Sequence, residues 1–318
     1  MWLLRRFYEQ NDHPSPRFAF QGTVNWMRAL AIQCQNEDFS QHGLRECYQT
    51  VQRRQPNDSA DTLSFQYLLM AFHEKAALSE LKDTNNPYPI VKTAIIAWYY
   101  SVYFSSKAML AASSGADPQN HTGTAKMWGR ELASQGWVKH PFNLAFTDLT
   151  PANIDTTMQL LRGENEFDQN TTPENAEMAL GAIYSYLKGT ANYEKERLEK
   201  EVKKSREFRD GGYENFRTNA AKALRDAKLT QGNVNFLIQA FRYRGKANYR
   251  DAIYLTYGND YSERLTQFIL DLNDVSSAFV SMAKVYVSRR VVADAWTDFV
   301  ADLRENAHVE LPFEPGEI

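Results

Sequence analysis

The sequence is poor in the residues that end helices and reverse the chain. Glycine and proline together make up 26 of the 318 residues, about 8% against a usual ~12%. No proline lies between Pro173 and Pro312, and no glycine lies between Gly258 and Gly316. Sheets built from tight hairpins need such residues at their turns. This scarcity excludes an all-β fold.

Cysteine is scarce as well. Cys34 and Cys47 are the only two, which is too few for a disulfide framework. Neither cysteine has a histidine or a second cysteine at metal-ligand spacing, so a zinc site is not expected. A reducing compartment is the simplest interpretation.

The sequence also lacks a long hydrophobic run and a large excess of one charge. The most apolar run, residues 93–104, spans about 12 residues, whereas a bilayer-spanning helix needs ~20. At the start, Arg5 and Arg6 follow the apolar residues and no apolar stretch comes after them, unlike a signal peptide. The 36 basic and 39 acidic residues give a net charge of -3. We therefore expect a soluble, cytoplasmic protein in which any nucleic-acid site is a local patch.

The motifs of several enzyme classes are missing. None of GxxxxGK[ST], GxGxxG, GxSxG and HExxH occurs in the chain. The single ExxH, from Glu305 to His308, lacks the second copy that a di-iron bundle needs. Asp294, Asp298 and Asp302 share one helical face, for which a solvated surface is the favoured interpretation. We expect no metal and no cofactor.

Helical periodicity is the main positive signal, and it predicts an all-α fold. The strongest element covers 90–114, is apolar nearly all round and ends at Gly115. A helix of this kind lies at the centre of a domain, so we expect Trp98 to be buried. Its aromatic side chains should pack on the closing helix around 268–286.

Weaker patterns predict the other helices. The first 85 residues indicate two or three helices, with Asp61 as one N-cap. Thr150 and Thr172 each precede a proline that suits a first helical turn. Residues 193–210 carry seven basic and six acidic side chains, which favours a solvated helix held by ion pairs. The remaining expected helices cover 125–134, 151–163, 173–189, 233–241 and 262–303.

The segment 242–251 is the first candidate site. Arginines form paired hydrogen bonds with phosphates, tyrosines stack on bases, and asparagine contacts polar edges. Gly245 should interrupt the helix and present the segment to a cleft. The alternative is a structural ion-pair network through Arg250 and Asp251. The candidate residues are Arg242, Arg244, Lys246, Asn248, Tyr249, Arg250 and Asp251.

His121 is the second candidate. It lies in the sequence Asn-His-Thr-Gly-Thr at 120–124, which we expect to be part of a polar loop. A histidine titrates near neutral pH and can therefore transfer protons. The alternative is an ordinary solvated loop histidine.

Three segments, and a fourth in the last long helix, resemble HEPN domains. The second core helix of those domains resembles AIIAWYYSVYFSSKAML at 94–110, with its small-aromatic-aromatic-small run followed by a basic residue and a leucine. The histidine-containing loop of many small bacterial HEPN proteins resembles 120–123. The arginine-to-Asp/Asn-Tyr segment that precedes their last helix resembles 244–251, and 278–286 fits that helix. The resemblance covers 88–140 and 213–290.

The resemblance implies a helical bundle that forms a homodimer. Many HEPN proteins are metal-independent RNases of toxin–antitoxin, phage-defence and CRISPR systems. Their arginine and histidine, about four to six residues apart, polarise the phosphate and handle protons while the RNA 2′-hydroxyl attacks. Here Arg242 is followed at that spacing by Asn248, which cannot transfer a proton near pH 7. His121 is the candidate replacement if it lies over the Arg244 segment.

The enzyme hypothesis assigns roles to five residues. Arg244 and Arg250 would hold phosphate, Tyr249 would stack, Asn248 would contact ribose or phosphate, and His121 would move protons. The alternatives are a non-catalytic HEPN-like binding or assembly module and a purely structural helical scaffold. The implied partners are RNA or a nucleotide, a second copy of the chain and a partner protein of a defence or toxin–antitoxin system, with no membrane.

The same reasoning predicts how the chain is divided. An insertion separates the two halves of a HEPN-like core, and a helical extension precedes the first half. The predicted parts are an N-terminal extension at 1–86, a first core half at 87–144, a helical insertion at 145–212 and a second core half at 213–318 with a long C-terminal helix.

Overall fold

The computed structural model describes residues 2, 6, 16–249 and 252–309, and within this part of the chain the fold is all-α, as predicted. The only strands in it, β1 (Ala145–Phe146) and β2 (Val234–Asn235), form one short antiparallel pair. The helices are α2 (Pro16–Asn36), α3 (Gln41–Cys47), α4 (Asp58–Leu81), α5 (Val91–Ser114), α6 (His121–Glu131), α7 (Pro151–Arg162), α8 (Ala176–Lys204), α9 (Arg206–Asp210), α10 (Asn219–Leu229), α11 (Phe236–Tyr249), α12 (Ala252–Thr256), α13 (Ser262–Arg290) and α14 (Ala293–Asn306), with a short 3₁₀ turn at Ala133–Gln135.

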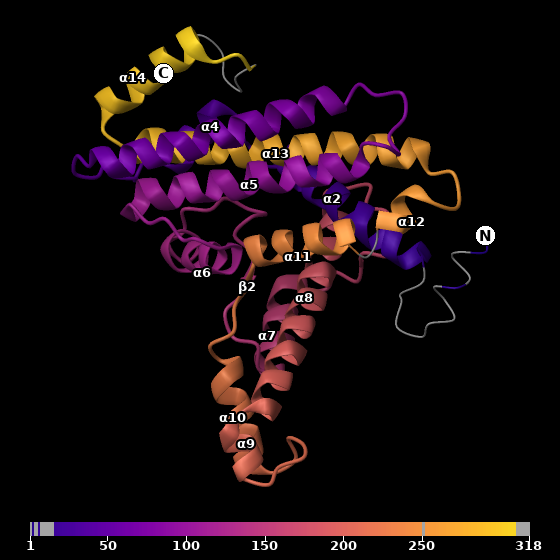
Figure 1. Ribbon diagram of the computed structural model, residues 1–318. Helices are drawn as coiled ribbons and strands as arrows, with labels where there is room; N and C mark the ends of the chain where they lie inside the picture. The colour runs from indigo at the N-terminus through magenta and orange to yellow at the C-terminus, as the bar shows by residue number, and fades with distance from the viewer. Residues whose placement is uncertain (1, 3–5, 7–15, 250–251, 310–318) are drawn as a thin grey trace.

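Helix α5 lies at the centre of the body, as its sequence predicts. It packs against α4 and α13 on one side and against α11 on another (Figure 1). Trp98 is fully buried, and the hydroxyl oxygens of Ser101 and Ser276 lie 2.7 Å apart where α5 meets α13. Gly115 ends the helix with a φ of 73°, a left-handed conformation that glycine adopts without steric cost. The predicted contact between the central and closing helices is confirmed. The ring contacts that Trp98 and Tyr99 make outside α5, however, are with α2, α6 and α11 and not with 268–286.

Several predicted helix boundaries are wrong, because other polar side chains form the caps. The side chain of Asn57, rather than Asp61, caps α4 by accepting a hydrogen bond from the Ala60 amide. Asp61 instead forms a buried ion pair with Arg54. Asn175, rather than Thr172, caps α8. The closing helical stretch is divided between α13 and α14 by an extended residue, Val291.

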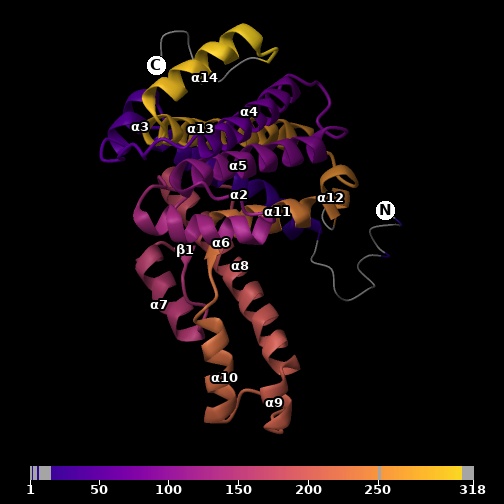
Figure 2. The ribbon, with the colours of Figure 1, turned by 60° about the vertical axis from the view of Figure 1, so that its left-hand side comes forward.

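An arm projects from the body, and its far part is formed by the end of α8 together with α9 and α10 (Figures 1 and 2). Helix α8 does not end near Gly189 as predicted but continues to Lys204. At the far end of the arm, Val202, Phe208 and Ala221 form a small hydrophobic core separate from the main one. The predicted boundary at residue 212 falls inside the arm, between α9 and α10.

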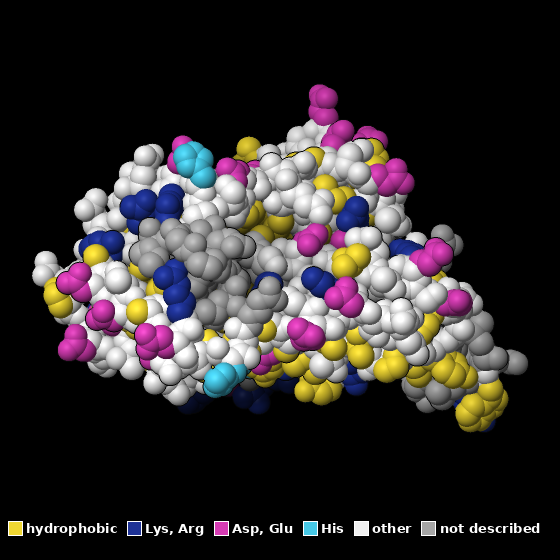
Figure 3. All heavy atoms as spheres, turned by 90° about the horizontal axis from the view of Figure 1, so that it is seen from above, with side chains coloured by type: hydrophobic (Ala, Val, Ile, Leu, Met, Phe, Trp, Pro, Cys, Tyr) yellow, Lys and Arg dark blue, Asp and Glu magenta, His cyan; other side chains and the backbone are white. Residues whose placement is uncertain are grey.

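The described side chains on the face of the body over α14 do not gather into a patch of one charge (Figure 3). Acidic, basic and hydrophobic side chains are interspersed on this face (Figure 3). Asp294, Asp298 and Asp302 of α14 are all exposed, in keeping with the solvated face expected from their spacing. No helix in the described ranges is both long enough and apolar enough to cross a bilayer.

Candidate functional site

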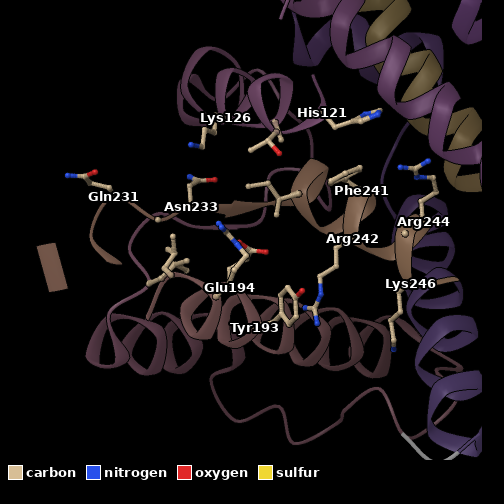
Figure 4. A pocket seen from close by; sticks show the side chains of 18 of the residues that line it. His121, Lys126, Tyr193, Glu194, Gln231, Asn233, Phe241, Arg242, Arg244 and Lys246 are labelled. Carbon is tan, nitrogen blue, oxygen red and sulfur yellow. The ribbon is translucent and has the colours of Figure 1, made fainter. Parts of the chain in front are cut away.

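A cleft of about 690 Å³ lies where the arm meets the body (Figure 4). Side chains from α6, α8, α10 and α11 line it, together with Leu149 and the chain that leads into β2. Helix α11 carries the predicted segment and continues to Tyr249 without a break at Gly245. The segment therefore meets the cleft as the side of a helix and not as a helix end or turn.

Basic side chains outnumber acidic ones in this lining. Six basic residues and one acidic residue, Glu194, contribute to it. On the α8 side, Arg197 forms ion pairs with Glu194 and Glu201, and Lys228 lies 3.4 Å from Glu201. On the α6 side, no carboxylate of the described residues lies within ion-pair distance of Lys126. Among the described residues, Lys126 is therefore a cation of the lining whose charge no carboxylate pairs with.

Arg244 packs against aromatic rings instead of a carboxylate. Its guanidinium carbon lies 4.9 Å from the ring centroid of Tyr99 and 5.4 Å from that of Phe241, within the range of a cation–π contact. No carboxylate in the described ranges is within ion-pair distance, and the buried Nε of Arg244 has no hydrogen-bond partner there. The ion-pair network that was the alternative for this segment is not observed at Arg244.

His121 lies beside Arg244 and α11. It is the first residue of α6 and does not belong to the preceding loop, because the Asn120 side chain caps the helix by accepting a hydrogen bond from the Gly123 amide at 2.8 Å. The imidazole stacks on Phe241, with ring centroids 4.8 Å apart and an angle of 17° between the planes. The structure thus brings together two candidate residues that are far apart in the sequence.

Tyr99 holds the other side of the His121 ring. Its hydroxyl lies 2.7 Å from Nδ1 of His121. Burial raises the pKa of Tyr99 well above its usual range, so the phenol stays protonated. Because no other acceptor is found for it in the described structure, we assign the phenol as the donor to Nδ1, which places the ring proton of neutral His121 on Nε2.

The environment of His121 also favours its neutral form. Burial lowers the pKa of this imidazole, and the charges of Arg244 and Lys107 lower it further. At pH 7 the ring is therefore uncharged and presents an N–H donor at Nε2. In this state it can hydrogen-bond to a phosphate or ribose oxygen, and after protonation it can act as an acid.

The other candidates from the segment have different environments. Arg242 stacks on Tyr193, with its guanidinium carbon 3.8 Å from the ring centroid, and Figure 4 shows the two side chains meeting across the cleft. Lys246 and Tyr249 also line the cleft, and Tyr249 is 81% exposed. Asn248 is not part of the lining, although its buried Oδ1 has no hydrogen-bond partner within the described residues. Arg250 and Asp251 lie outside the described residues.

Four lining or contacting residues were not predicted from the sequence. Tyr99 was expected only as a core aromatic, and Tyr193 and Lys126 had no local motif around them. Asn233 was expected to cap a helix, but Asn235 does so, accepting a hydrogen bond from the Ile238 amide at 3.1 Å. The buried Oδ1 of Asn233 therefore has no partner in the described structure, and its side chain and that of Lys126 point toward each other (Figure 4).

The described residues contain no group of three or more histidine, cysteine, aspartate or glutamate side chains that could hold a metal ion. Comparison of the chain with protein-family models, with curated proteins and with solved structures finds no match. The chemistry of the cleft therefore has to be argued from its own side chains.

Proposed function

We propose that the cleft binds RNA or a nucleotide through its phosphate groups. The observation that carries this proposal is the environment of Arg244, a partly buried cation that contacts aromatic rings and has no carboxylate of the described residues within ion-pair distance. A buried polar atom without a partner is costly, and a phosphate oxygen would supply that partner. Lys126, Arg242 and Lys246 line the same cleft and add to the attraction.

The aromatic and amide side chains of the cleft support a nucleotide over a simple anion. Tyr249 and Tyr193 are exposed tyrosines in the lining, and exposed aromatic rings stack on bases. Asn233 and Gln231 lie at the other end, and amide side chains hydrogen-bond to base edges. The cleft therefore combines cations for the phosphate, aromatic rings for the face of the base and amides for the edge of the base.

RNA cleavage is a second candidate function, which is favoured by the position of His121. A titratable imidazole stands next to an arginine that would hold phosphate, so one group could neutralise charge while the other transfers a proton. The neutral ring donates a hydrogen bond from Nε2 to the leaving oxygen, and it can transfer that proton only after Nδ1 is protonated as well, so that neutral imidazole remains. Membership of a bacterial defence or toxin–antitoxin system stays a prediction from the resemblance to HEPN proteins.

Arg244→Gln tests the proposal. With a fluorescein-labelled single-stranded RNA of about three nucleotides, anisotropy titrations should show wild-type binding that weakens steeply with salt. The variant should lose ~1.5–3 kcal/mol, the usual worth of a hydrogen bond to a charged group, or roughly a tenfold or larger rise in Kd. Arg304→Gln, at an exposed arginine of α14, is the matched control and should bind as wild type.

Thermal unfolding separates the proposal from the structural alternative. If Arg244→Gln lowers the melting temperature sharply while the wild type shows no salt-sensitive RNA binding, Arg244 is a structural residue and the proposed function is wrong. An unchanged melting temperature together with lost binding places Arg244 in the binding site.

A further inference from the structure

The outer part of the arm projects beyond the cleft, away from the body (Figures 1 and 2). Helices α9 and α10 pack chiefly on α8, and the small core of Val202, Phe208 and Ala221 holds the far end together. A projecting element with a core of its own keeps its shape without support from the body. Its surface is therefore a fixed extension of the cleft wall (Figures 1 and 2).

One face of α8 connects the cleft with the arm. Tyr193 and Arg197 line the cleft, and Lys200 and Lys204 follow at positions seven and eleven residues after Tyr193. Residues at i, i+4, i+7 and i+11 lie on the same side of an α-helix. We call these four residues the α8 stripe. It runs from the cleft to the end of α8, about 16 Å at 1.5 Å per residue.

The charges of the arm are paired near the cleft and largely unpaired farther out. Near the cleft, Arg197 is held between Glu194 and Glu201. Farther out, both Lys200 and Lys204 are exposed, and no carboxylate of the described residues is within ion-pair distance of either. Residues 202–225 contain seven basic and three acidic side chains in a chain whose net charge is -3. The outer arm keeps ion pairs between Arg206 and Asp210 and between Arg225 and Asp226. The ion-paired surface expected from the sequence is therefore found there only in part.

We infer that the ligand of the cleft is a single-stranded RNA long enough to leave the cleft and follow the α8 stripe, rather than a mononucleotide. This inference rests on the proposed function. Successive phosphates of one stacked strand advance about 3.4 Å along the strand axis, so the ~16 Å stripe spans roughly five of them. Unpaired lysines in line with an aromatic and basic cleft match the groove-like sites that follow a nucleic-acid backbone.

The composition of the arm favours RNA over a membrane or a hydrophobic protein partner. Tyr193 is the only large hydrophobic side chain exposed on the described arm from 193 to 229, and it belongs to the cleft. A helix that lies in a membrane interface presents an apolar face next to its basic one. The exposed apolar face that such binding requires is not present on this surface.

The test uses a stripe variant, the double substitution Lys200→Gln/Lys204→Gln. The control is the double substitution Lys82→Gln/Lys92→Gln, which removes two exposed lysines from the α4–α5 region of the body. Anisotropy titrations use single-stranded RNAs of about three and about twenty nucleotides over a range of salt concentrations. Wild type should bind the long RNA more tightly than the short one. The stripe variant should lose about tenfold in affinity for the long RNA alone, and its salt slope should be smaller by ~1.4, since each phosphate contact contributes ~0.7.

Other outcomes overturn the inference and separate it from the proposed function. If wild type binds both RNAs equally, or the stripe variant binds the long RNA like the control, the arm does not follow RNA although the cleft still binds it. If the stripe variant loses the same affinity for the short RNA as for the long one, the two lysines contribute to binding inside the cleft, and the inference of a longer path along the arm is wrong. Wild type that binds neither RNA refutes the proposed function, and so does binding to phosphatidylserine vesicles without any RNA binding.

Discussion

Trp98→Ala is the substitution whose effect on stability follows most directly from the structure. Trp98 is fully buried in the middle of α5. Its ring makes edge-to-face contacts with Trp26, at 5.9 Å between centroids, and with Tyr243, at 5.5 Å. Removing a buried tryptophan costs ~3–5 kcal/mol, and loss of two aromatic pairs places this site at the upper end of that range. Because small and medium domains unfold with only ~5–15 kcal/mol, the variant should retain little stability.

Trp98→Phe separates the two contributions to this cost. The indole Nε1 of Trp98 is buried and has no hydrogen-bond partner in the described structure. The phenylalanine variant leaves a smaller cavity and also removes an unpaired buried donor, which by itself costs ~1–3 kcal/mol. We therefore expect Trp98→Phe to lower the free energy of unfolding by less than ~1.5 kcal/mol. A larger loss would mean that Nε1 makes a stabilising hydrogen bond.

Equilibrium urea unfolding measures both variants. The midpoint should fall while the slope m stays constant, since the surface exposed on unfolding hardly changes. Tyr249→Ala, at a residue that is 81% exposed, is the control and should change the free energy of unfolding by less than ~0.5 kcal/mol. If Trp98→Ala costs no more than this control, the central position of α5 is wrong.

Three further predictions concern the cleft and the whole chain. His121→Ala should abolish any RNA cleavage, measured by gel electrophoresis of labelled RNA, and leave RNA binding within about twofold. Stability should fall as the pH drops below about 6.5, because the lowered pKa values of His121 and His140 make the native state bind fewer protons than the unfolded state. His121→Gln should flatten this decline in urea titrations at different pH, and an unchanged decline would contradict it. The resemblance to HEPN proteins predicts a homodimer, which the solution mass at micromolar concentration will test, and a monomeric mass would contradict it.

The central helix could be predicted because its signal is local and strong. A long run of apolar side chains on all sides indicates a buried helix, and Gly115 marks its end. Predictions failed where an isolated glycine was taken as a helix end. Gly189 and Gly245 each lie within a continuous helix, and a side chain at either position would meet open space. Packing of the flanking residues outweighs the ~1 kcal/mol that glycine costs in a helix.

The candidate site could be predicted only where its residues are neighbours in the sequence. Arg242, Arg244 and Lys246 were found because three basic residues lie within five positions. Lys126 comes from a different helix, and nothing in the adjacent sequence marks it. Tyr99 looks like any other aromatic of a buried helix until the structure shows its hydroxyl 2.7 Å from His121. Such residues are identified by their distance from one another, which a single sequence does not contain.

In the charged stretch at 193–210, the sequence correctly predicted the ion pairs of Arg197 but not the different environment of Lys200 and Lys204. Alternating signs predict a helix covered with ion pairs, and the pairs of Arg197 agree with this. The nearly equal numbers of basic and acidic residues over the whole stretch do not show that Lys200 and Lys204 have no carboxylate of the described residues within ion-pair distance. These two lysines lie on the same helical face as Tyr193 and Arg197. Reading the stretch by helical position instead of by composition would have found the α8 stripe from the sequence. Only the structure adds that this stripe begins at a cleft whose opposite wall carries Arg244, an arginine that has no carboxylate of the described residues within ion-pair distance.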